Sequence, residues 1–221
     1  MSFRELDALL GHVSLFDMPE AYERGSMAAS LFRLRVWRSR VLVLKEGKGA
    51  WALDAGSGRG LTGRMVERRG AFVVQMDASY ESLKKSSGER VQGVFSSPPF
   101  RPSVFDAIIM SFSLHMVVDK AFAVTVLGTK LKKGGEFFVL DIARPKSRLI
   151  AEIFGIYTRI LAPLMAFLAT GRDIRLFCGL HEMYASTLSA EEWRSLLTGL
   201  FAVKELKELD LGIAFSFLGT N

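Results

Sequence analysis

Three glycines at alternate positions, Gly56, Gly58 and Gly60, follow an apolar run that ends in an acidic residue, Asp54. An amphipathic segment over 61–69 begins directly after them, and this pattern predicts a strand, a glycine-rich turn and a helix. Glycine tolerates a positive φ and lets a ligand press against bare backbone. The helix start adds free N–H groups and a partial positive charge. The turn is therefore a candidate ligand site formed by Asp54, Gly56, Ser57, Gly58, Gly60 and Thr62.

The spacing of the glycines separates two classes of ligand. Dinucleotide-binding folds use G-x-G-x-x-G, whose last glycine packs the helix against the strand, but this chain has Leu61 at that position. Its spacing is G-x-G-x-G after Leu53-Asp54, which resembles the first motif of class I S-adenosylmethionine (SAM)-dependent methyltransferases. A tight turn without any ligand is the alternative interpretation of this stretch alone.

A second acidic residue, Asp77, lies 21 positions after Gly56 and ends the next apolar run, 71–76. An acid at this place accepts hydrogen bonds from both hydroxyls of an adenosine ribose. The alternative role, capping the following helix, suits Ser79 better. For Asp54 two roles remain open: it orients the glycine turn, or it holds the methionine ammonium directly or through water.

Secondary-structure elements must bring the glycine turn and the two acidic residues together. From residue 71 onward, apolar runs alternate with amphipathic segments. This alternation predicts βαβ units, a parallel sheet and right-handed crossovers. The carboxyl ends of the strands then share one edge, where ligands bind. Asp54, Asp77, Val94, Ser111 and Asp141 fall at that edge or just beyond it. We predict further strands at 71–76, 90–94, 105–110, 136–141, 201–209 and 212–218, helices at 79–87, 119–131 and 189–198, and a turn at 133–135.

Two helical regions flank this pattern in what we expect to be a single domain, 1–221. An N-terminal cap, 1–45, contains a predicted helix around Leu6 to Phe16 and a second from Ser26 to Leu44. The second carries four arginines, at 33, 35, 38 and 40, and its basic face either meets lipid or phosphate or is simply solvated. A lid insertion, 146–185, is apolar and covers either a ligand or the sheet.

Composition narrows the class of protein without selecting a partner. The 221 residues carry a net charge of +6, which permits nucleic acid, anionic lipid or acidic small molecules. The single cysteine, Cys178, excludes an internal disulfide and a cysteine-clustered metal site, so no metal is expected. We expect a cytoplasmic protein, with the inner face of the membrane as a peripheral location. The apolar stretch 149–170 contains Glu152 and Arg159 and does not predict a membrane span.

Several motifs outside the glycine turn point to one family. Tyr22-Glu-Arg-Gly-Ser26 followed by Trp37-Arg38 looks like a Tyr-Asp-x-x-Asn…Trp-Arg signature, and Ala143-Arg-Pro145 is followed by Tyr157 and Pro163. On these motifs the chain resembles the C-methyltransferases of ubiquinone and menaquinone biosynthesis. The resemblance implies an α/β, Rossmann-like class I methyltransferase fold, with a seven-stranded, mostly parallel sheet and a terminal antiparallel hairpin. It also implies SAM as cofactor and S-adenosylhomocysteine as product.

The resemblance extends the predicted cofactor site to Asp77, Ala78, Val94, Phe95 and Ser111. The chain departs from the family pattern in three places. Val94 replaces the Asp or Asn that commonly ends the third strand, so that backbone carbonyls and stacking on Phe95 would serve the adenine. His115-Met116 replaces the usual Arg-Asn, and Met183 replaces a serine.

Carbon methylation of a phenolic ring is helped by a base near the hydroxyl. The candidates are His115 and Asp141, and an imidazole is the side chain most often used for this task. Arg144 is a candidate for stabilising the phenolate, with a plain surface charge as the alternative. The substrate-binding candidates are Tyr22, Tyr157 and His181.

The leading hypothesis is an enzyme that methylates a small, lipophilic acceptor, as in C-methylation of a prenylated quinol. Alternatives are a methyltransferase for another small metabolite or for RNA, and a non-catalytic SAM-binding protein. Nucleic acid is the weaker partner, because no separate RNA-binding domain and no Asn-Pro-Pro-Tyr-like motif are present. The oligomeric state stays open.

Overall fold

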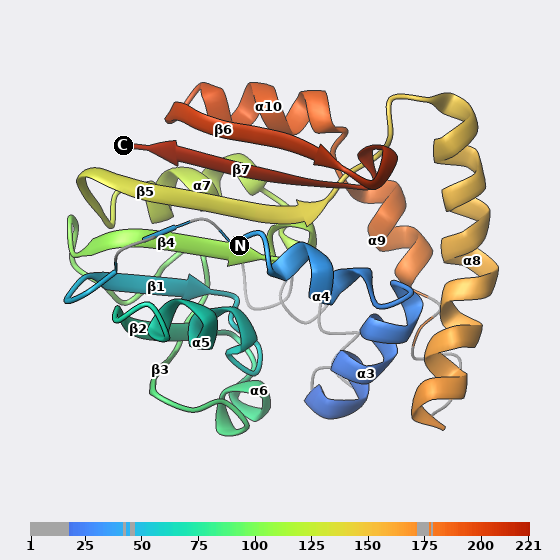
Figure 1. Cartoon of the computed structure of the whole chain (residues 1–221), viewed down its shortest axis with the longest axis horizontal. Coiled ribbons are helices and arrows are strands. Elements are labelled where there is room, and N and C mark those ends of the chain that lie inside the picture. The colour runs from blue at the N-terminus through green and yellow to red at the C-terminus, as the bar shows by residue number, and fades with distance from the viewer. Residues whose placement is uncertain (1–17, 42, 45–46, 172–176, 178) are drawn as a thin grey trace.

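A seven-stranded sheet forms the centre of the molecule in a computed structural model that describes residues 18–41, 43–44, 47–171, 177 and 179–221 (Figure 1). Strands β1 to β5 pair in parallel, and β7 pairs antiparallel with both of its neighbours. The predicted mostly parallel sheet with a terminal antiparallel hairpin is therefore confirmed. Across the sheet the strands are β3 (Glu89–Gln92), β2 (Phe72–Asp77), β1 (Trp51–Ala55), β4 (Phe105–Ser111), β5 (Leu131–Ile142), β7 (Ala214–Thr220) and β6 (Ala202–Leu209).

Helices cover both faces of the sheet because successive strand residues point to opposite sides. One buried cluster joins β-strand residues to α7 (Lys120–Gly128) and α10 (Ala190–Thr198). The other joins the opposite face to α4 (Arg33–Arg38) and α5 (Leu61–Glu67). Side chains cap four of the described helix starts: Ser79 caps α6 (Tyr80–Lys84), Asp119 caps α7, Ser147 caps α8 (Arg148–Thr170), and Ser189 forms a capping box on α10.

The predicted basic helix from Ser26 to Leu44 is wrong as a single element. The chain forms α3 (Pro19–Ala29) and α4, separated by a left-handed bend at Leu31 and Phe32, whose φ angles are 50° and 64°. Arg33 fixes the bend, since its Nε donates to Asp210 Oδ2 at 2.6 Å. Tertiary contact with a distant loop thus overrides the helical pattern. The helix predicted around Leu6 to Phe16 lies outside the described residues.

The predicted turn at 133–135 is also wrong, because these residues belong to β5. Gly134 has a φ of +75°, and the register with β4 shifts between Phe105 and Ala107. This pattern is a bulge, which glycine accommodates within a continuing strand. The predicted strand 90–94 is β3, 89–92, and Val94 forms an isolated bridge with Ser97.

Two helices occupy the predicted lid region, α8 (Arg148–Thr170) and α9 (Leu180–Ser186). Figure 1 shows α8 at the right margin, beside α3 and α9 and beyond the carboxyl ends of the parallel strands. The Tyr157 hydroxyl of α8 donates to the Ala29 carbonyl at 2.7 Å, and Phe154 packs edge-on against Tyr184. Short 3₁₀ helices, η2 (Leu114–Met116) and η4 (Asp210–Gly212), complete this end of the molecule.

Candidate active site

The glycine turn follows β1, and each of its three glycines has a positive φ, between +54° and +74°. A Cβ on Gly56 would collide with Ser113, and one on Gly60 would collide with Gln75. A Cβ on Gly58 would meet no atom within 4 Å. Packing therefore requires glycine at 56 and 60, whereas Gly58 faces open space that a ligand can enter.

Two carboxylates hold this turn in place. Asp77 Oδ2 accepts from the Gly58 N–H at 2.7 Å, and Asp77 Oδ1 accepts from the Ser79 N–H at 2.8 Å. Burial raises the pKa of Asp77, although these backbone hydrogen bonds act in the opposite direction. Asp54 Oδ2 accepts from the Gly63 N–H at 2.7 Å, and its Oδ1 has no partner within the described chain. Burial raises the pKa of Asp54 to about 7.

A cavity of about 1080 Å³ opens at the carboxyl edge of the sheet. Asp54 and Gly60 are not among its lining residues, and both are buried. The Oγ atoms of Ser57 and Ser111 are buried in the cavity wall and find no hydrogen-bond partner in the described part of the chain. The predicted cofactor residues that line the cavity are Gly56, Ser57, Gly58, Thr62, Asp77, Ala78, Val94, Phe95 and Ser111.

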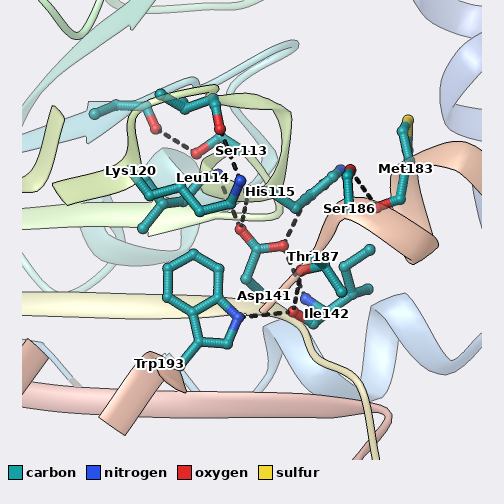
Figure 2. A network of polar contacts seen from close by, with 12 residues as sticks. Ser113, Leu114, His115, Lys120, Asp141, Ile142, Met183, Ser186, Thr187 and Trp193 are labelled. Carbon is teal, nitrogen blue, oxygen red and sulfur yellow. Dashed lines mark hydrogen bonds and ion pairs between the residues drawn. The ribbon is translucent and has the colours of Figure 1, made fainter. Parts of the chain in front are cut away.

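The two predicted base candidates form one hydrogen-bonded pair (Figure 2). His115 Nδ1 lies 2.5 Å from Asp141 Oδ1, and both side chains are almost fully buried. Asp141 Oδ2 also accepts from the backbone N–H groups of Leu114 and His115, at 2.9 and 3.0 Å. His115 Nε2 is buried without a partner among the described residues, and His115 lines the cavity. The pairing joins the turn after β4 to the end of β5.

The remaining predicted site residues divide between the cavity and its surroundings. Tyr22 and Tyr157 line the cavity, and burial raises the pKa of both phenols. Arg144 lies outside it and forms an ion pair with Glu192 at 3.1 Å. His181 is also absent from the lining, and its two ring nitrogens contact Thr158 and Arg159.

Sequence reasoning missed the charged wall opposite the glycine turn. Arg59 Nη1 lies 2.6 Å from Glu23 Oε2, which ties the turn to α3. Arg38 lines the cavity with its guanidinium carbon 5.7 Å from the centre of the Phe112 ring. The signal was present in the sequence, since Arg38 belongs to the Trp37-Arg38 motif, but we treated it as part of a helix face.

The sheet order, the glycine turn and the cavity at the strand ends define a class I methyltransferase. Comparison with known sequences agrees, because a family described as a methyltransferase domain matches residues 53–139. SAM is therefore the cofactor and S-adenosylhomocysteine the product. The residues present fit this cofactor: the space at Gly58 admits it, and the unpartnered hydroxyls of Ser57 and Ser111 face its site.

Individual relatives define the family more closely. A demethylmenaquinone methyltransferase from Mycolicibacterium paratuberculosis is 30% identical over 172 residues, covering 75% of this chain and 75% of the relative. One from Mycobacterium marinum is 27% identical over 208 residues, covering 86% and 90%. The chain therefore belongs to the SAM-dependent methyltransferase family that includes the demethylmenaquinone methyltransferases.

Solved structures show the same fold. A SAM-dependent methyltransferase from Thermotoga maritima, described as a possible histamine N-methyltransferase, superposes with a TM-score of 0.64 at 18% identity, covering 94% of this chain and 98% of that one. A putative methyltransferase from Haloferax volcanii, solved with the Trm112 activator, gives 0.65 at 14% identity, covering 93% and 96%.

Proposed function

We propose that this methyltransferase acts on a quinol that carries a lipophilic chain, and that it methylates a carbon of the ring. The observation that carries this proposal is the chemistry of the cavity beyond the glycine turn. There the walls consist of apolar and aromatic side chains, which suit a flat, hydrophobic acceptor. They come from α3, α4, α8 and α9 and include Tyr22, Leu34, Ile150, Ile153, Phe154, Tyr157, Leu180 and Met183. The names of the mycobacterial relatives support the same acceptor class.

SAM, when bound, supplies an electrophilic methyl group on a sulfonium that leaves without a proton. The protein's tasks are to align the acceptor, to exclude water and to remove the proton of the acceptor hydroxyl. Alignment of two reactants alone contributes on the order of 7–11 kcal/mol to lowering the barrier. The apolar wall formed by α8 and α9 serves the first two tasks.

We assign proton removal to His115. A carboxylate accepts hydrogen bonds, so Asp141 holds the Nδ1–H tautomer of the imidazole and leaves the Nε2 lone pair free. Nε2 takes the hydroxyl proton of the quinol, and the resulting phenolate places electron density on the neighbouring ring carbon. After that carbon has taken the methyl group it loses its own proton, and the hydroxyl regains the proton held by His115, so that the aromatic quinol is restored. Asp141 is a positioning residue, itself fixed by the amides of Leu114 and His115. Arg144 has no part in this proposal, because it lies outside the cavity.

The proposal includes a peripheral location at the cytoplasmic face of an anionic membrane, where such quinols reside. By length and composition, α8 is able to cross a membrane, and only 22% of its most apolar 18-residue window is buried against the protein. Large apolar side chains recur every three or four residues on its exposed side: Leu149, Ile153, Ile156, Ile160, Leu164 and Phe167, here called the α8 outer face. The face therefore suits lying in the membrane surface better than spanning it. Two exposed arginines of the α3–α4 region, Arg35 and Arg40, match anionic headgroups.

Labelled SAM and a reduced demethylmenaquinone-type quinol in detergent test the acceptor. We expect mass spectrometry to find the labelled methyl on a ring carbon. The oxidised quinone is the matched control and should give no product, because it has no hydroxyl to ionise. Transfer only to a water-soluble phenol or another metabolite present in a cell extract, with none to the quinol, would contradict the proposal.

A further inference from the structure

One rim of the cavity is formed by exposed apolar side chains from three separate elements. Leu31, Ile153 and Leu211 all line the cavity, and they are 56%, 58% and 75% exposed. They come from the α3–α4 bend, from α8, and from η4, which connects β6 to β7 (Figure 1). These three residues are here called the cavity mouth.

Two of the mouth residues lie on strained backbone. Leu31 has a φ of 50° and Leu211 a φ of 62°, a left-handed conformation that leucine rarely adopts. The Asp210 carboxylate ties the two segments together, because it accepts from Arg33 Nε and Nη2 and from Trp37 Nε1 at 2.5 to 2.7 Å. Strain of this kind persists only where surrounding contacts impose it, and it clusters at functional sites. The contacts of Asp210 therefore hold two apolar side chains at the rim, outside the buried core.

The order of the strands places the mouth beyond the reacting groups. Along the carboxyl edge of the sheet the cofactor residues follow β2 and β1, His115 follows β4, and Asp141 lies near the end of β5. The next strand is β7, which η4 joins to β6. Ile142, at the end of β5, and Ile213, just before β7, also line the cavity and continue its apolar wall toward η4. An acceptor whose hydroxyl meets His115 therefore has the cofactor on one side and this apolar path on the other.

A second apolar rim lies at the cofactor end of the cavity. Tyr80, Val118 and Phe122 line the cavity and are each at least half exposed. Tyr80 lies three residues after Asp77, so this rim adjoins the predicted place of the adenosine. It is the less suitable exit for any part of the acceptor.

We propose that the cavity mouth holds the lipophilic chain of the acceptor, and that Leu31 and Leu211 give the enzyme its preference for acceptors with such a chain. The inference deepens the proposed function and rests on it. A hydrocarbon chain binds by removing apolar area from water, and it needs no polar partner at the rim. Ile153 belongs both to the mouth and to the α8 outer face, so the two apolar surfaces are continuous. A chain can therefore pass from a membrane surface into the cavity.

The test is a set of binding measurements on protein saturated with S-adenosylhomocysteine. Calorimetry compares naphthoquinone without a chain, the same ring with a geranyl chain, and geraniol, which has the chain but no ring. The oxidised rings have no hydroxyl to ionise, so no turnover disturbs the measurement. We expect the wild type to bind the geranyl quinone at least tenfold more tightly than the chainless ring, and to bind geraniol.

The variant that tests the mouth replaces Leu31 and Leu211 together by asparagine. Asparagine tolerates the left-handed backbone, so the double variant should keep the unfolding midpoint of the wild type. Its affinity for the geranyl quinone should fall to that for the chainless ring, which itself should change by no more than about twofold. Binding of geraniol should be lost. Leu211→Met keeps an apolar side chain at the rim and should keep the preference.

Leu168→Asn is the matched control, because Leu168 is exposed and does not line the cavity. It should bind all three probes as the wild type does. Equal affinity of the wild type for the two quinones, or a preference that the double variant keeps, would overturn the proposal. A preference lost in Val118→Asn instead would also overturn it and place the chain at the second rim.

Failure of the acceptor proposal gives a different result. Geraniol binding that depends on Leu31 and Leu211, in a protein that methylates no quinol, would support the mouth and overturn only the quinol. If none of the three probes binds to the wild type, both proposals are wrong.

Discussion

At the scale of single residues, the site depends on a few side chains whose partners come from distant parts of the chain. His115 is the clearest case, because Asp141 holds one ring nitrogen and the other, in the cavity wall, has no partner among the described residues. An imidazole held in one tautomer by a carboxylate is a recurrent arrangement for a general base.

His115→Gln tests this role. Glutamine is of similar size but cannot take up a proton, so kcat for the quinol should fall by about 10²–10⁴-fold, the usual contribution of general-base catalysis. SAM affinity, measured by calorimetry, should change little. A variant that keeps wild-type kcat would remove His115 from the mechanism.

Asp54 predicts a pH dependence of stability. Burial raises its pKa in the folded protein from 3.8 to about 7, so the folded protein retains a proton that the unfolded chain releases between those values. The contribution of this group to stability therefore falls as the pH rises through that window. Asp54→Asn keeps an acceptor for the Gly63 N–H but cannot ionise.

We expect Asp54→Asn to gain stability relative to wild type by about 2–3 kcal/mol between pH 5 and pH 8, since each pKa unit corresponds to about 1.4 kcal/mol. Urea unfolding at the two pH values measures this difference. A difference between variant and wild type that is independent of pH would show that Asp54 titrates normally.

The open space at Gly58 predicts a binding defect without a folding defect. Gly58→Ala places a methyl group where the cofactor must approach, and calorimetry should show SAM affinity reduced at least tenfold. The positive φ at Gly58, +54°, adds strain of about 1 kcal/mol. Gly134→Ala is the control, because Gly134 also has a positive φ and open space around its Cβ but lies in the β5 bulge. Its SAM affinity should equal that of wild type.

At the scale of elements, α8 has two apolar sides with different surroundings. One side packs on α3 and α9 and contributes to the cavity wall, whereas the α8 outer face is exposed. Exposed apolar surface of this extent on one helix marks an interaction site. Ile153 belongs to both sides, being 58% exposed and a cavity-lining residue, so the outer face continues into the cavity.

Replacing Ile156 and Ile160 together by Asp tests the membrane role of α8. Both side chains are exposed and neither lines the cavity. Partition into anionic vesicles should fall at least tenfold, because burying each side chain contributes about 1.5–3 kcal/mol. Val203→Asp, at an exposed position on β6, should partition as wild type does. If co-sedimentation of the double variant matches that of wild type at low and high salt, the membrane contact lies elsewhere.

At the scale of the whole molecule, the cofactor site is shared among elements that are far apart in the sequence. Its walls come from α3 and α4, from the turns after β1 and β2, and from the segment after β4. Ligand binding to such a site stabilises the entire fold by mass action, because the unfolded chain has no site to offer.

S-adenosylhomocysteine at 100 times its Kd should therefore raise the free energy of unfolding by about 2.7 kcal/mol. Asp77→Ala should lose most of this stabilisation at the same ligand concentration, since hydrogen bonds to a charged group contribute about 1.5–3 kcal/mol. Thermal or urea unfolding with and without ligand measures both values. If the ligand stabilises Asp77→Ala as much as it stabilises the wild type, the ribose does not bind at Asp77.

The sequence by itself determined the fold class, because alternating apolar runs and the G-x-G-x-G turn are local patterns that specify βαβ units and a ligand-binding edge. The sequence also identified most of the cavity-lining residues on the cofactor side, because they lie just after the ends of predicted strands. Only the tertiary structure decided the pairing of His115 with Asp141, the break at Leu31 and Phe32, and the place of Arg38 in the cavity wall beside Phe112. Each of these depends on contacts between segments far apart in the chain, and local periodicity carries no information about such distances.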